Sequence, residues 1–145
     1  MPDVNLSIQH PRLYQRLADL SKEADAVVAE AGLDPLLGEL VKLRVSQING
    51  CAFCLRMHTR DALAKGETTD RLAVVAAWWE SQYFTAVERD ALAMAEQVTY
   101  LDRPGQHHSE EGALTGQQAS AVAWLAVVMN AWNRVAITSH YPTSP

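Results

Sequence analysis

The sequence predicts an all-α fold of about six helices in a single domain over residues 1–145. Two observations carry this prediction. No stretch shows the sustained alternation of apolar and polar residues that a half-buried strand requires, whereas apolar residues recur at helical spacing along most of the chain. The segments between these stretches are short and contain signals that start or stop helices, so they offer no boundary between domains.

The first two helices are predicted from their ends as well as from their apolar spacing. The first runs from Pro11, a residue favoured in the first turn of a helix, to the stop signal Gly32. Asp34 and Pro35 then provide an N-cap and a first-turn proline, which open a second helix that reaches about Ile48. The two helices are therefore expected to be joined by a short connection.

The third helix is predicted to follow a turn at Asn49-Gly50. It runs from about Cys51 to Lys65 and is closed by Gly66, so the CxxC sequence lies at its N-terminus. A fourth, largely buried helix is expected over residues 70–81, capped by Thr68, Thr69 or Asp70.

Two capping boxes predict the starts of the last two helices. Thr85 with Glu88 opens a helix through Leu101, and Thr115 with Gln118 opens one to about Thr138. Residues 102–112 between them are the most loop-like segment. The centre of the last helix, AVAWLAVVMNAW, is apolar nearly all round, which predicts burial in the middle of the bundle or in a subunit interface. The four tryptophans are expected to pack in the core or an interface.

Composition and charge narrow the classes of function. The net charge is −5, and lysine and arginine are scattered singly rather than gathered into a basic face, which argues against nucleic-acid binding. The N-terminus lacks the pattern of a secretory signal, and the longest apolar run, Ala121–Met129, is about half of a membrane span. A soluble cytoplasmic protein is expected. In that reducing compartment, a CxxC pair is typical of redox or metal-binding sites.

Two thiols and an imidazole share one face of the third predicted helix. Cys51 and Cys54 are three residues apart, and His58 follows Cys54 by four. A break at Gly50 would leave Cys51 near the helix N-terminus, where unpaired N–H groups favour a thiolate. Reversible dithiol chemistry, with His58 moving a proton to or from Cys54, is the favoured interpretation. Two ligands of a structural zinc and a pair of buried structural thiols remain as alternatives; c-type haem attachment would require histidine in place of Leu55.

Glu39 is less obvious from the residue pattern. It lies roughly opposite the main apolar stripe of the second predicted helix, and Lys42 follows three residues later. The pattern alone favours an exposed ion pair between these two side chains.

Together these residues resemble a known signature. Glu39, eleven residues, and then Cys51-Ala-Phe-Cys54-Leu-Arg-Met-His58 is similar to the E-x11-CxxC-x3-H pattern of the alkylhydroperoxidase AhpD-like family, within the carboxymuconolactone decarboxylase superfamily. The flanking KLRVSQING and the late NAWNRVAI agree as well. The resemblance implies an all-helical fold that assembles as trimers or hexamers.

It also implies a peroxidase cycle. Cys54 would be the peroxidatic thiol and Cys51 the resolving thiol, while Glu39 and His58 would form a proton relay. The substrate would be hydrogen peroxide or a small organic hydroperoxide. A separate dithiol, lipoyl- or thioredoxin-like, would reopen the disulfide, and we expect no cofactor and no metal.

One residue departs from the pattern. The lipoamide-linked peroxidases of this family carry a histidine directly before the second cysteine, where this chain has Phe53. A simpler relay is therefore expected, with slow turnover or a different reductant. Two other functions stay open: a dithiol redox protein without peroxidase activity, and a cofactor-free decarboxylase or lactone-processing enzyme. The cysteine pair counts against the latter, because decarboxylases of the superfamily generally lack it.

Overall fold

The computed structural model describes residues 2–103, 107, 109 and 112–145, and every regular element among them is a helix. The elements are α1 (Leu6–Gln9), α2 (Pro11–Glu30), α3 (Pro35–Asn49), α4 (Ala52–Ala64), α5 (Thr69–Val74), the 3₁₀ helix η1 (Val75–Glu80), α6 (Ala86–Thr99) and α7 (Gly116–Thr138). The all-α prediction is confirmed. The loop predicted over residues 102–112 lies partly outside the described residues.

The predicted caps form in the structure. The side chain of Asp34 accepts a hydrogen bond from the backbone of Leu36 at the start of α3. Thr85 and Thr115 each form a complete capping box, which satisfies backbone N–H groups at the starts of α6 and α7. Five of the predicted helices therefore correspond to α2, α3, α4, α6 and α7.

Two details differ from the prediction. The short α1, capped by Asn5, precedes the first predicted helix. The helix predicted over residues 70–81 is divided, because α5 ends at Val74 and η1 contains Ala77 in a non-helical conformation (φ −129°, ψ 37°). The break accompanies the burial of Trp78, whose exposed fraction is 0 %, and whose indole N–H donates to Glu96.

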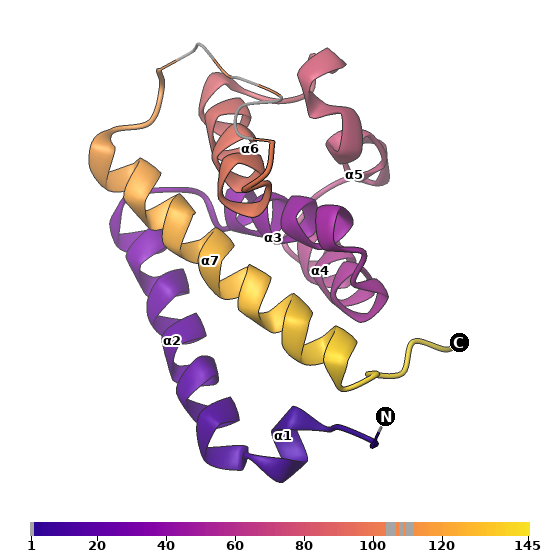
Figure 1. The fold of residues 1–145 in the computed structure, drawn as a ribbon. Coiled ribbons are helices and arrows are strands. Elements are labelled where there is room, and N and C mark those ends of the chain that lie inside the picture. The colour runs from indigo at the N-terminus through magenta and orange to yellow at the C-terminus, as the bar shows by residue number, and fades with distance from the viewer. Residues whose placement is uncertain (1, 104–106, 108, 110–111) are drawn as a thin grey trace.

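Helices α3 and α7 form the centre of the molecule. Figure 1 shows α7 running along the bundle, with α2 on one side and α3, α4 and α6 on the other, and the contacts of α7 are made mainly with α2, α3 and α6. Nearly every residue of α3 from Leu37 to Ser46 is buried. By length and hydropathy α7 could cross a membrane, but its packing against three helices is that of a core helix.

Two buried polar networks join these helices. Asn133 of α7 donates to the hydroxyl of Ser46 (3.0 Å) and accepts from the amide of Asn49 (2.9 Å), which ties the C-terminal end of α3 to α7. Elsewhere, Glu96 of α6 forms an ion pair with Arg44 of α3 (2.8 Å), and its carboxylate also accepts from Trp78. The end of α3, just before the cysteines, is thereby held in place.

Candidate active site

The turn between α3 and α4 brings the two cysteines to the start of a helix. Gly50 adopts a left-handed conformation (φ 69°), which glycine allows without steric cost, so the chain reverses direction there. Cys51 is the N-cap of α4, and its sulfur accepts from the backbone N–H of Cys54 (3.3 Å). The two cysteines form a disulfide and are almost completely buried, with exposed fractions of 1 % and 2 %. The predicted place of the CxxC sequence is thus confirmed.

His58 lies one turn further along α4 and is held by Glu39 of α3. Its Nδ1 is 3.1 Å from Oε2 of Glu39, and the ring is buried. An ionised carboxylate can only accept, so Nδ1 is the donor, and in the neutral imidazole Nε2 then carries a free lone pair. Nε2 is buried and has no hydrogen-bond partner among the described residues. The structure therefore presents a base without a partner.

The surroundings of Glu39 keep it ionised. Only 2 % of the residue is exposed, so the surface ion pair favoured by the residue pattern is wrong. Burial by itself would raise the pKa of this carboxyl, but the hydrogen bond from His58, the charge of Lys42 and the hydrogen bond from Lys65 outweigh it and lower the pKa to about 2. Oε1 forms an ion pair with Lys65 and lies 3.7 Å from Nζ of Lys42.

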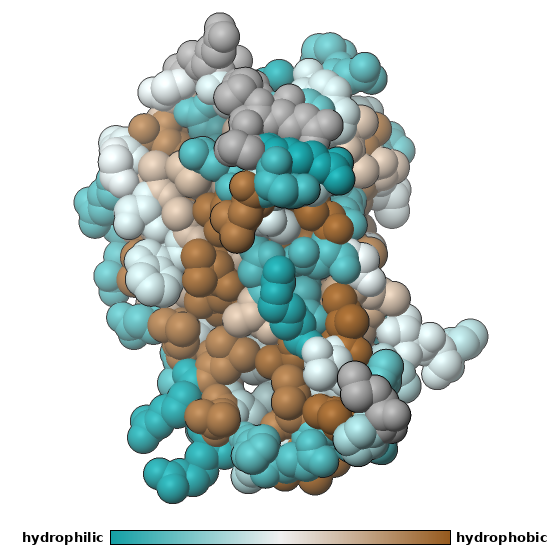
Figure 2. All heavy atoms as spheres, in the orientation of Figure 1, coloured by the Kyte–Doolittle hydropathy of each residue, from teal (hydrophilic) through white to brown (hydrophobic). Residues whose placement is uncertain are grey.

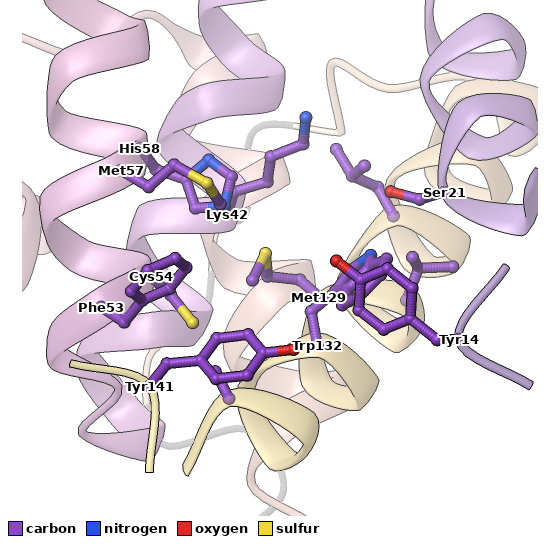
Figure 3. A pocket seen from close by; sticks show the side chains of 13 residues that line it. Tyr14, Ser21, Lys42, Phe53, Cys54, Met57, His58, Met129, Trp132 and Tyr141 are labelled. Atoms are coloured by element: carbon purple, nitrogen blue, oxygen red, sulfur yellow. The ribbon is translucent and has the colours of Figure 1, made fainter. Parts of the chain in front are cut away.

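A pocket of about 320 Å³ opens beside the disulfide. Figure 3 shows Phe53, Cys54 and His58 on one wall, with Tyr14 across from them and Tyr141 at the lower edge. Cys51 is not among the lining residues, so the pocket reaches the second sulfur and not the first. The lining is mostly apolar and comes from α2, α3, α4, α7 and the segment after α7: Tyr14, Ser21, Lys42, Phe53, Cys54, Met57, His58, Leu125, Val128, Met129, Trp132, Ala136 and Tyr141.

Phe53 and the two tyrosines form an aromatic part of the wall of this pocket. The ring of Phe53 meets that of Tyr141 edge to face, with centroids 5.1 Å apart. Burial, the charge that Tyr141 would carry and a hydrogen bond with Tyr141 raise the pKa of Tyr14, so its hydroxyl stays protonated and can donate a hydrogen bond near neutral pH. The position that departs from the lipoamide-linked peroxidases thus contributes an aromatic wall.

A metal has poor support at this site. Among the described residues, the group of possible ligands within 4.8 Å of one another is Glu39, His58 and Asp61, which includes neither cysteine. Lys42 and Lys65 already place positive charge beside Glu39. Their ammonium groups would repel a cation bound to the same carboxylate.

The residue pattern alone missed several contributors to the site. Lys65 follows His58 by seven residues and is the C-cap of α4, so helical spacing held a signal that the two lie on one side of this helix. Tyr14 and Tyr141 have no such signal, because only the packed fold brings α2 and the segment after α7 to the cysteines. Trp132, expected to pack in the core or an interface, contributes to the pocket wall.

Comparison with known proteins places this site in a family. A sequence model of the carboxymuconolactone decarboxylase family matches residues 11–97, which include Glu39, both cysteines and His58. The chain belongs to the carboxymuconolactone decarboxylase family. The resemblance inferred from the sequence is thereby confirmed at the level of the family.

Two relatives and one solved structure illustrate how this family member compares with known proteins. It is 37 % identical to the uncharacterized protein YdfG of Bacillus subtilis, over 68 % of this chain and 70 % of that protein. It is 36 % identical to the uncharacterized protein YnjA of Escherichia coli, over 44 % of this chain and 35 % of that protein. A crystal structure from Agrobacterium tumefaciens, described as a protein of unknown function and a candidate antioxidant defence protein AhpD, shares the fold. That match has a TM-score of 0.84 and 24 % identity, over 100 % of this chain and 99 % of the other.

Proposed function

We propose that this protein is a thiol-dependent peroxidase that reduces hydrogen peroxide or small organic hydroperoxides through a Cys51–Cys54 dithiol and disulfide cycle. The observation that carries the proposal is the shared pocket of Cys54 and His58. Cys54 and His58 line the same cavity, which has room for a small organic molecule, and Nε2 of His58 has no hydrogen-bond partner among the described residues.

The first step uses Cys54 as the nucleophile. In the reduced protein, Nε2 of His58 takes the proton of the Cys54 thiol, and the thiolate attacks the distal oxygen of the hydroperoxide. The O–O bond breaks, sulfur is oxidised to a sulfenic acid, and the alkoxide takes the proton from His58 to leave as an alcohol. Glu39 contributes by holding His58 through Nδ1.

The second step closes the disulfide. The Cys51 thiol attacks the sulfur of the Cys54 sulfenic acid, the S–S bond forms, and the hydroxyl group leaves as water with the proton of Cys51. An external dithiol, lipoyl- or thioredoxin-like, then supplies two electrons and two protons to restore both thiols. A reducing cytoplasm would provide such a reductant, and we place the protein there.

Assembly with further copies is part of the proposal. Large apolar side chains are exposed on α1, α2 and α7, and Figure 2 shows apolar residues gathered over the face where α2 and α7 lie. Apolar patches of this kind commonly mark interfaces. We propose that this face packs against other copies of the chain in a trimer or hexamer. The large apolar side chains exposed on these three helices are Ile8, Leu13, Leu20, Trp124, Val127 and Ile137.

A dithiol redox protein without peroxidase turnover is the second candidate. The disulfide is almost completely buried, and Phe53 replaces the second histidine of the lipoamide-linked relatives. Such a sensor would form the disulfide once and would consume no further peroxide, even with abundant reductant. The family name also leaves a decarboxylase as a third candidate. The activity of such an enzyme would survive the loss of both cysteines.

Cysteine variants test the peroxidase directly. Cys54→Ser is expected to abolish peroxide-dependent loss of thiols, because the nucleophile is gone. Cys51→Ser is expected to stop after the first step and accumulate a sulfenic acid on Cys54, which a dimedone label followed by mass spectrometry would detect. Unchanged peroxide consumption by Cys54→Ser would refute the proposal.

A further inference from the structure

The two oxygens of the Glu39 carboxylate face different parts of the molecule. Oε2 meets His58, which lines the pocket beside Cys54. Oε1 meets Lys65, which follows α4, and lies near Lys42. A second cavity of about 190 Å³ is lined by Glu39, Lys42 and Lys65, and neither cysteine contributes to it. Glu39 thus links the base in the first cavity with two cations in the second.

The two lysines have different attachments. The ammonium of Lys42 is 2.8 Å from Asp25 of α2 and only 3.7 Å from Glu39. The ammonium of Lys65 forms its ion pair with Glu39 itself. Lys65 is therefore the cation that most directly fixes the position of this carboxylate.

The position of the Glu39 carboxylate matters because a second carboxylate lies near the same N–H of His58. Asp61, on α4 with His58, has a carboxylate oxygen 3.9 Å from Nδ1 of the imidazole, whereas that of Glu39 is at 3.1 Å. If Glu39 moved away, a turn of the ring toward Asp61 would redirect Nε2. The charged groups around Glu39 are thus Asp25 from α2, Lys42 from α3, His58 and Asp61 from α4, and Lys65 after it.

We propose that Lys65 is a positioning residue of the thiol site: by binding Oε1 of Glu39 it keeps Oε2 on Nδ1 of His58, which holds the imidazole in one orientation in the pocket that it shares with Cys54. This inference rests on the proposed function for its purpose. Its physical content, a dependence of Cys54 acidity on Lys65 through Glu39, does not require peroxidase turnover. No role in contact with the substrate is assigned to Lys65.

The test measures the alkylation rate of Cys54 by iodoacetamide as a function of pH, in reduced protein that carries Cys51→Ser. Lys65→Met removes the charge and keeps most of the side-chain stem. It is expected to raise the midpoint of the pH profile by about half a unit or more, because a badly placed imidazole stabilises the thiolate less. Lys65→Arg should retain most of the original profile. Lys22→Met, which removes an exposed lysine, is the matched charge control.

Two further measurements separate positioning from a general structural effect. Lys65→Met should add little to Glu39→Gln, since both changes act through the same carboxylate. Ethylammonium should partly restore the profile of Lys65→Ala by entering the second cavity, whereas tetramethylammonium, which has no N–H, should not. Additive effects of the two substitutions, or an unchanged midpoint in Lys65→Met, would overturn the inference. A coupled shift in a protein that consumes no peroxide would keep this inference and remove the proposed peroxidase.

Discussion

Among single residues, Glu39 has the surroundings that most affect the chemistry of the site. Its carboxylate lies in the interior between an imidazole and two ammonium groups. A buried charge requires such partners, because leaving water without them is costly. The same contacts that make the charge tolerable also hold His58 in one orientation, so the stability of the site and its proposed reactivity depend on the same carboxylate.

The lowered pKa of Glu39 predicts a pH dependence of stability. An unfolded carboxyl titrates near 4.5 and the folded one near 2, so this stabilisation is present above pH 4.5 and is lost as the pH falls toward 2. The difference is worth about 3 kcal/mol. Urea unfolding of the oxidised protein between pH 2 and 5 should therefore show a free energy of unfolding that rises more steeply with pH than it does in Glu39→Gln. Equal slopes in the two proteins would show that Glu39 does not cause this pH dependence of stability.

The His58→Gln variant is expected to lose proton transfer at the site and to keep its folded structure. Glutamine can still approach Glu39 but cannot act as a base, so the rate constant for the reaction of reduced protein with peroxide should fall about 100-fold or more. Stopped-flow measurement at pH 7 gives this constant directly. His10→Gln, which changes an exposed histidine, is the control and should react as the unsubstituted protein does. Equal rates for both variants would exclude His58 as the base.

Among the helices, α3 has the most demanding position, because nearly all of its central residues are buried and several are polar. Ser46 and Asn49 are satisfied by Asn133, and Arg44 by Glu96. Each buried polar group has its partner on another helix, which fixes how α3 lies against α6 and α7. These contacts therefore also fix the position of the turn that carries the cysteines.

Removing one member of the ion pair should be costly. Glu96→Ala removes the carboxylate that accepts from the buried guanidinium of Arg44 and from the indole N–H of Trp78, and leaves Arg44 with Gln47 as its remaining acceptor. The expected loss in the free energy of unfolding is about 3–5 kcal/mol, measured by urea denaturation. Replacing both charges while keeping an acceptor for Trp78, as in Arg44→Met with Glu96→Gln, should recover much of that loss. A loss below about 1 kcal/mol in Glu96→Ala would contradict the buried ion pair.

The helices were largely predictable because their signals are local. Asp34, Thr85 and Thr115 cap helices through contacts two or three residues away, which a sequence displays directly. The break at Ala77 was not predictable in the same way. The stretch is apolar throughout, and only the tertiary contact of Trp78 with Glu96 distinguishes a bent path from a continuous helix.

For the molecule as a whole, some residues of the site can be predicted from local spacing in the sequence, whereas others are brought together only by the packed fold. The column of Cys51, Cys54 and His58 is a prediction from helical spacing alone. In the structure Cys51 is the N-cap of α4, Cys54 and His58 belong to the helix, and a disulfide joins the two cysteines. Glu39 is predicted as a site residue only by the family resemblance. Its place in the apolar pattern of the helix is typical of an exposed residue, although the side chain is buried. Tyr14 and Tyr141 come from opposite ends of the chain, and no local pattern indicates that they share a pocket.

The outward face of α7 predicts assembly. Trp124 is 54 % exposed although it belongs to the most apolar helix of the chain. Trp124→Glu would place a charge in the proposed interface, so light scattering after size-exclusion chromatography should show a smaller assembly than for the unsubstituted chain. Arg134→Glu, an exposed charge change on the same helix, serves as a comparison for charge alone. A monomer for the unsubstituted chain would contradict the proposed oligomer.

The most direct test of the peroxidase is a stopped-flow titration of the reduced protein with peroxide, followed by mass spectrometry of the cysteines. The proposal predicts that each chain consumes one equivalent of peroxide without added reductant and gains a Cys51–Cys54 disulfide, with continued consumption once a dithiol is supplied. No disulfide at stoichiometric peroxide would contradict the mechanism.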